Sequence, residues 1–151
     1  MNMSGLIAVL VLSALVAILL RQSAKSSQKR RPYRGMKVEH QGEVFDLARV
    51  APKWHEIQAM LKNGPSGLRS ALFEADKLLD YVMQAKGFRG ATMGERLKYD
   101  GKRLSNLNDV WAAHKLRNQF AHSLDHDMVP AQVQKAVRDL GKAISDLGVR
   151  I

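Results

Sequence analysis

The sequence predicts an all-α protein with an N-terminal transmembrane helix followed by a compact antiparallel bundle of four to five helices. Three observations support this fold class. The first twenty residues form an uncharged apolar run, apolar side chains recur at three- and four-residue steps from Pro52 onward, and no stretch shows the alternation of a strand. These patterns divide the chain into an anchor at 1–20, a basic linker and extension at 21–50, and a helical bundle at 51–151.

The N-terminal run is long enough to cross a bilayer. About 20 apolar residues at a rise of 1.5 Å per residue span the ~30 Å hydrocarbon core. A cleaved signal peptide is the alternative, but no basic residue precedes the run, and basic side chains crowd the candidate cleavage site after Leu20. We therefore expect an uncleaved, single-pass anchor in the cell membrane.

A strongly basic strip follows the anchor. Residues 21–37 hold seven Lys or Arg and no acid, which is +7 of the chain's net charge of +10 and leaves +3 for residues 38–151. The positive-inside bias places this strip, and the domain after it, in the cytoplasm. The expected role of this strip is attraction to anionic headgroups, and binding of nucleic acid is the alternative. The membrane-proximal basic residues are Arg21, Lys25, Lys29, Arg30, Arg31 and Arg34.

The linker composition does not support a core. Residues 21–35 are rich in Ser, Gln, Lys and Arg, which is typical of a flexible tether. Residues 36–50 contain apolar side chains without a clean period, so a short helix and an extension lying on the domain both remain open. The absence of cysteine excludes disulfides and thiolate chemistry.

Two helices are expected between Pro52 and Gly87. Pro52 suits the first turn of a helix, and Asn63-Gly64-Pro65 ends that helix. Ser66 suits the N-cap of the second helix, which Gly87 ends. Apolar side chains at helical spacing mark the buried faces: Trp54, Ile57 and Leu61, then Leu68, Leu72, Ala75, Leu79 and Val82.

One short helix and two longer ones complete the expected bundle. Thr92-Met-Gly-Glu95 is a capping-box pattern that opens a short helix through Leu97, and Asp100-Gly101 is a turn. Ser105 or Asn106 caps the next helix, and Pro130 opens the last one before Gly148. Short connections favour antiparallel neighbours. The expected buried residues are Leu107, Val110, Trp111, Leu116 and Phe120, then Val133, Val137, Leu140, Ile144 and Leu147.

The segment 114–122 holds the candidate chemistry. No Gly-rich phosphate loop, cysteine pair or paired-carboxylate motif occurs in the chain. His122 and His126, flanked by Asp125 and Asp127, are the one set with metal-ligand chemistry, but a solvated loop before Pro130 explains them better. We therefore predict neither a metal nor a cofactor.

The spacing of Arg117 and His122 limits how they can act together. Five residues separate them, so on a regular helix they point about 140° apart. Asn118 lies four residues from both His114 and His122 and shares a face with each. A site that uses Arg117 and His122 needs a helix end or kink near Phe120, or a second subunit.

Arg117-Asn118-x3-His122 resembles the Arg-x4–6-His motif of HEPN domains (higher eukaryotes and prokaryotes nucleotide-binding). The runs 75–80, 87–97 and 111–122 carry the resemblance, which covers about residues 52–148 and is nearest to membrane-tethered, largely uncharacterised bacterial members. It implies a bundle of four or five helices, often dimeric, in which two motifs face one cleft. It also implies that active members are metal-independent ribonucleases.

The resemblance assigns a role to each motif residue. Arg117 would stabilise the charge of a pentacovalent phosphate, His122 would act as acid or base, and Asn118 would orient the substrate. The structural alternative is that Asn118 bonds a neighbouring helix, His122 caps its own helix, and Arg117 pairs with Asp76 or Asp80.

The expected function is a membrane-anchored interaction or nucleotide/RNA-binding module, with a metal-independent endoribonuclease as the alternative. The expected partners are the lipid bilayer, a second copy in a homodimer, RNA or a nucleotide, and an unknown protein. Beside the motif residues, the candidate binding residues are His114, Lys115, Arg96, Lys98 and Arg103.

Overall fold

The computed structural model describes residues 45–122 and 128–151. The expected anchor, the basic residues from Arg21 to Arg34, and His126 lie outside these ranges. The chain separates into two units, Met1–Met36 and Lys37–Ile151, and all the helices described below belong to the second. None of these described helices has the length and apolarity that crossing a membrane requires.

The described part of the chain is helical and holds no strand. A short 3-10 turn, η1, precedes the first α-helix, and a second one, η2, follows the short fourth helix. The prediction of an all-α bundle is confirmed for the described residues. The elements are η1 (Leu47–Arg49), α2 (Val50–Met60), α3 (Gly64–Ala85), α4 (Met93–Asp100), η2 (Gly101–Arg103), α5 (Leu107–His122) and α6 (Pro130–Asp146).

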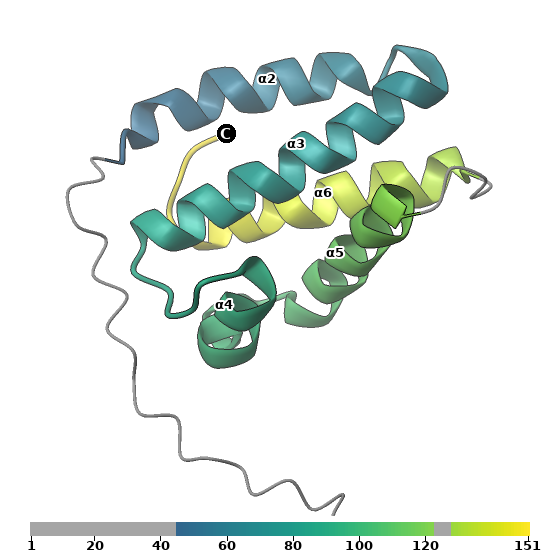
Figure 1. Cartoon of the computed structure of the whole chain (residues 1–151). Helices are drawn as coiled ribbons and strands as arrows, with labels where there is room; N and C mark the ends of the chain where they lie inside the picture. The colour runs from purple at the N-terminus through teal and green to yellow at the C-terminus, as the bar shows by residue number, and fades with distance from the viewer. Residues whose placement is uncertain (1–44, 123–127) are drawn as a thin grey trace, which may run out of the picture. The chain divides into compact units, whose positions relative to one another are not determined.

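The long helix α3 lies at the centre and packs against α2, α5 and α6 (Figure 1). Helices α2 and α3 are antiparallel, since the Asp46 N–H, just before α2, donates to the Tyr81 hydroxyl near the end of α3. Helices α5 and α6 are antiparallel as well, because Ser105 at the start of one bonds Asp146 at the end of the other. Helices α3 and α6 run in the same direction (Figure 1).

The core is formed by apolar faces of all four long helices. The closest approach occurs where Trp54 of α2 meets Gly141 of α6, because a Cβ at that glycine would lie 2.4 Å from the indole ring. Burying each large aliphatic side chain contributes about 1.5–3 kcal/mol. The largest fully buried side chains include Ile57, Leu72, Leu79, Met83, Val110, Phe120, Leu140 and Ile144.

Two predicted helix ends are confirmed in detail. Gly87 and Gly148 adopt left-handed backbone conformations, with φ of +71° and +77°. At the first, the Phe88 N–H donates to the Met83 carbonyl at 2.9 Å, which is the long bond of a Schellman motif. The glycines therefore end α3 and α6 at the residues that the sequence indicates.

The predicted N-cap at Thr92 is confirmed, but only half of the capping box is present. The Thr92 hydroxyl accepts the Glu95 N–H at 3.2 Å, which satisfies a free donor of the first turn of α4. The Glu95 carboxylate accepts the Ala91 N–H at 2.8 Å instead of the Thr92 N–H.

The predicted cap at Ser66 is wrong. Helix α3 begins at Gly64, where φ of +68° lets the chain turn, and Pro65 lies inside the first turn. Proline fits there because the first N–H groups of a helix have no acceptor within the helix. Helix α2 also starts earlier than Pro52, at Val50, after the 3-10 turn capped by Asp46.

Ser105 and Asn106, the expected caps of α5, bond to α6. The Ser105 hydroxyl donates to Asp146 at 2.6 Å, and the Asn106 amide donates to the Asp139 carbonyl at 2.9 Å. These two side chains thus fix the start of α5 against the C-terminal half of α6.

Candidate functional site

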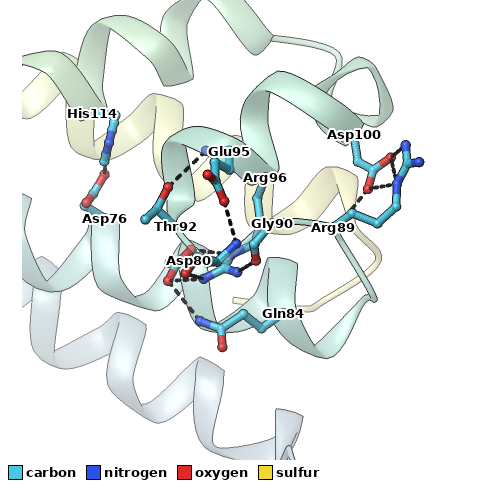
Figure 2. Close-up of polar contacts among 11 residues, drawn as sticks. Asp76, Asp80, Gln84, Arg89, Gly90, Thr92, Glu95, Arg96, Asp100 and His114 are labelled. Atoms are coloured by element: carbon cyan, nitrogen blue, oxygen red, sulfur yellow. Dashed lines mark hydrogen bonds and ion pairs between the residues drawn. The ribbon is translucent and has the colours of Figure 1, made fainter. Parts of the chain in front are cut away.

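Four polar residues form a connected network between α3 and α5. Asp76 of α3 accepts a hydrogen bond from His114 Nδ1 at 2.9 Å (Figure 2), and its other oxygen lies 3.7 Å from Arg117 Nε. Asn118 lies between His114 and Arg117 and bonds both. We call Asp76, His114, Arg117 and Asn118 the α3–α5 network.

Arg117 determines the orientation of the other side chains in this network. Arg117 Nη1 donates to Asn118 Oδ1 at 3.1 Å, so the Asn118 amide nitrogen turns toward His114. That amide donates to His114 Nε2 at 3.3 Å, which leaves Nδ1 as the protonated nitrogen. The imidazole N–H then points at Asp76, so the bonds follow one consistent direction.

The network satisfies a buried carboxylate. The Asp76 side chain is only 8% exposed, and a buried charge without partners is strongly unfavourable. The pairing of Arg117 with Asp76, one of the two partners expected, is confirmed. Asp80, the other candidate, pairs with Arg96.

A second cluster lies beside the network. The Arg117 guanidinium carbon is 4.6 Å from the centre of the Phe73 ring, and that of Arg69 is 5.8 Å from the same ring. Arg69 also donates to the Phe120 carbonyl near the end of α5. We call Arg69, Phe73 and Arg117 the arginine–phenylalanine cluster.

The Arg117 guanidinium is only partly covered. Its Nε is buried and faces Asp76 at 3.7 Å without a hydrogen bond among the described residues, while the side chain as a whole is 34% exposed. Two guanidinium groups at one aromatic ring can present N–H donors to the same anion, because each has five donors in a planar fork.

Sequence reasoning missed Arg69 and Phe73. A usable signal was present, because Arg69, Phe73, Asp76 and Asp80 follow one another at steps of four, three and four residues. This is a second stripe on α3, beside the aliphatic stripe, and it faces α5 and α4.

His122 is not brought to Arg117. It is exposed at the last residue of α5, which continues through Phe120 without ending. The two side chains therefore keep the separation of about 140° expected on a regular helix. The expected helix end or kink near Phe120 does not join them, because α5 ends only at His122 itself; the second expected arrangement, a second subunit, remains.

Arg96 is held inside the domain. Its side chain is 4% exposed and forms two bonds to Asp80, from Nε at 2.8 Å and from Nη2 at 3.1 Å. It also donates to the carbonyls of Gly90 and Ala91 in the loop before α4 (Figure 2). Arg96 therefore fixes α4 on α3 and does not join a surface patch.

The other basic candidates are at the surface. Lys98 and Arg103 are exposed, and Arg103 lies 4.2 Å from the Phe88 ring centre while donating to the Lys86 carbonyl. Lys115 is exposed on α5 beside a shallow groove that Trp111 lines.

Asp100 forms the tightest ion pair near these residues. It receives hydrogen bonds from the Arg89 side chain at 2.6 to 3.2 Å and from the Arg89 backbone N–H at 2.7 Å (Figure 2). Hydrogen bonding from Arg89 lowers the pKa of Asp100 to about 2, against the opposing effect of burial. The pair closes the loop between α3 and α4.

No three His, Asp or Glu side chains gather as a metal site within the described ranges. The candidate set at 122–127 lies outside them except for His122.

The chain matches no protein-family model, no curated protein and no solved structure.

Proposed function

We propose that this chain is a membrane-anchored, HEPN-like helical module that binds RNA or a nucleotide at the α3–α5 interface. The single observation that supports this most strongly is the arginine–phenylalanine cluster, in which Arg69 and Arg117 lie over one ring. Guanidinium groups bind phosphate oxygens through parallel N–H donors, and the Arg117 side chain is 34% exposed beside Phe73 while its Nε faces Asp76.

The α3–α5 network would act as the support of this site. It holds Arg117 through Asp76 on one side and Asn118 on the other, so the guanidinium loses little freedom when a ligand binds. In this proposal Asn118 and His114 position Arg117 and do not contact the ligand.

Binding is tested with the full chain in zwitterionic nanodiscs. Fluorescence anisotropy with a short single-stranded RNA, and separately with a nucleoside triphosphate, measures the affinity of the wild type and of Arg69→Gln. We expect Arg69→Gln to weaken binding about tenfold and to reduce the slope of log K against log salt by about one.

Arg138→Gln is the matched control, because Arg138 is an exposed arginine on α6, away from the cluster. It should bind as the wild type does. If Arg138→Gln and Arg69→Gln lose the same affinity, or if the wild type binds neither probe, the proposal is wrong and the cluster serves packing alone.

A metal-independent endoribonuclease is the second candidate, and the exposed end of α5 favours it. His122 is exposed there, so a second copy of the chain could place its own His122 near Arg117. In such a site His122 would accept the proton of the ribose 2′-hydroxyl, whose oxygen attacks the adjacent phosphate; the 5′-oxygen leaves and takes a proton from water, and a 2′,3′-cyclic phosphate remains. Arg117 would stabilise the charge on the phosphate.

Subunit mixing tests the shared site. Arg117→Ala and His122→Ala are each expected to be inactive on RNA in EDTA, whereas a mixture of the two should recover part of the wild-type cleavage through heterodimers. Activity in either single variant, or no recovery in a mixture that light scattering shows to be dimeric, contradicts the shared-site ribonuclease.

A further inference from the structure

The excess positive charge of the helical domain is concentrated in one segment. Residues 38–151 hold seventeen basic and fourteen acidic side chains, and residues 86–104 account for six basic and two acidic ones. The remainder, eleven basic and twelve acidic, is nearly neutral. The domain therefore has one basic region and no general basic character.

These residues meet at one end of the bundle. Arg103 of η2 bonds the Lys86 carbonyl at the end of α3, and Arg89 pairs with Asp100 at the end of α4. We call Lys86, Arg89, Lys98, Lys102 and Arg103 the basic end. Lys98 and Lys102 are exposed and have no carboxylate partner among the described residues.

The chain enters the described domain at the same end. Phe45 packs edge-on against Tyr81 with ring centres 5.2 Å apart, and the Asp46 N–H donates to the Tyr81 hydroxyl at 2.7 Å. Tyr81 is five residues before Lys86, which is about 8 Å along a helix axis.

The aromatic rings at the basic end are covered. Phe88 is 3% exposed and lies under Arg103, and Lys98 lies over the half-buried Tyr99. Single-stranded nucleic acid is usually bound by exposed rings on which bases stack, and this end offers none among the described residues. Lysines around covered rings suit a phosphate surface without bases, such as anionic headgroups.

We propose that the basic end docks on the anionic surface of the membrane that holds the anchor. This inference rests on the proposed anchor and adds an orientation to it. The arginine–phenylalanine cluster lies near the start of α3, whereas Lys86 follows its last residue, so the two are at opposite ends of this helix. Docking therefore leaves the proposed phosphate site turned away from the lipid and open to the aqueous phase.

The absence of cysteine allows a direct test on the full chain. A donor dye is attached at Ala91→Cys, in the loop before α4, or at Ser66→Cys, in the first turn of α3. The two sites mark opposite ends of α3. Energy transfer to a headgroup acceptor is then measured in nanodiscs that contain phosphatidylglycerol or phosphatidylcholine alone.

We expect strong transfer from position 91 and weak transfer from position 66 in the anionic discs, and no difference in the neutral ones. Lys98→Gln with Lys102→Gln should lower the docked population by roughly fivefold per charge removed. Lys62→Gln with Arg138→Gln, which removes the same charge from exposed sites outside the basic end, should leave the transfer unchanged.

Three outcomes would overturn the docking. The first is equal energy transfer from both sites in anionic discs. The second is energy transfer that does not change with Lys98→Gln and Lys102→Gln. The third is binding of RNA to the basic end in neutral discs, which would make nucleic acid its ligand. Loss of the wild-type chain from the discs in a high-salt flotation would instead refute the anchor, and the docking with it.

Discussion

At the scale of single residues, Asp76 has the greatest influence on the α3–α5 interface. It is buried, and two nitrogen atoms of α5, His114 Nδ1 and Arg117 Nε, face its carboxylate. Its removal would leave His114 Nδ1 without an acceptor and Arg117 without a carboxylate, held only by Asn118 and the Phe73 ring.

Asp76→Asn keeps one acceptor oxygen but removes the charge and replaces the other oxygen with a donor, so it should lower the stability by about 1–3 kcal/mol, the cost of leaving buried polar groups poorly paired. For a domain of this size that corresponds to a fall in melting temperature of about 4–8 °C per kcal/mol. Circular dichroism of the full chain in detergent micelles measures it. Asp109→Asn is the control, because its partner Lys135 is 59% exposed and such pairs contribute little. Equal shifts in both variants would contradict the importance of the network.

The lowered pKa of Asp100 predicts how the stability of the domain depends on pH. Its pKa falls from 3.8 to about 2 because Arg89 donates to it. A lowered carboxyl pKa stabilises the folded state above the unfolded pKa, and this stabilisation disappears as the pH falls from about 4 to about 2. Asp100→Asn should therefore be about 1–2 kcal/mol less stable than the wild type at pH 7, since the exposed Arg89 limits the gain.

The difference between Asp100→Asn and the wild type should be largely lost by pH 2, close to the folded pKa of Asp100. Denaturant unfolding at both pH values checks this prediction. A difference that is constant with pH would show that the ion pair is not its cause.

At the scale of elements, the contact between α2 and α6 depends on one missing side chain. A Cβ on Gly141 would lie 2.4 and 2.6 Å from two ring carbons of Trp54, and the indole is rigid and 6% exposed. Gly141→Ala should cost about 1–3 kcal/mol through overpacking, despite the better helix propensity of alanine.

Gly94→Ala is the matched control for Gly141→Ala. It is also helical and faces an indole, but its Cβ would lie at an ordinary 3.7 Å from Trp111. It should be neutral or stabilising by up to about 1 kcal/mol. Thermal melts compare the two, and a stable Gly141→Ala would mean that α2 and α6 can move apart freely.

The helix ends show which parts of the fold could be predicted from the sequence. Local signals identified the glycine ends at Gly87 and Gly148 and the cap at Thr92, because each depends on residues within one turn. The start of α3 at Gly64 was not predicted, because Asn63-Gly64-Pro65 suits both a loop between helices and the first turn of a helix.

The candidate site was only partly predictable for the same reason. Arg117 and Asn118 were found from the motif, and Asp76 was one of two partners considered. The burial of Arg96 could not be predicted, because it depends on Asp80, sixteen residues away, and on two loop carbonyls. The role of Phe73 likewise needs α3 and α5 to be placed side by side.

At the scale of the whole molecule, the buried core of the described residues belongs entirely to the helical domain. Every buried core residue lies between Val50 and Val149. Deleting residues 1–20 should therefore abolish membrane retention while the melting temperature stays within about 2 °C, since every core residue that the structure describes is kept. Cell fractionation with an alkaline wash measures the first and circular dichroism the second. A deleted chain that stays with the membrane would contradict the anchor.

The central position of α3 has a consequence for how the domain opens. Helices α2, α5 and α6 all pack on α3, whereas the short α4 is attached by Arg96, by the buried side chains of Met93 and Leu97, and by a smaller contact with α5. Amide protons of α3 should therefore exchange with solvent only when the whole domain unfolds, and those of α4 through a separate local opening. The basic end would thus be the part of the bundle that can rearrange while the rest stays folded.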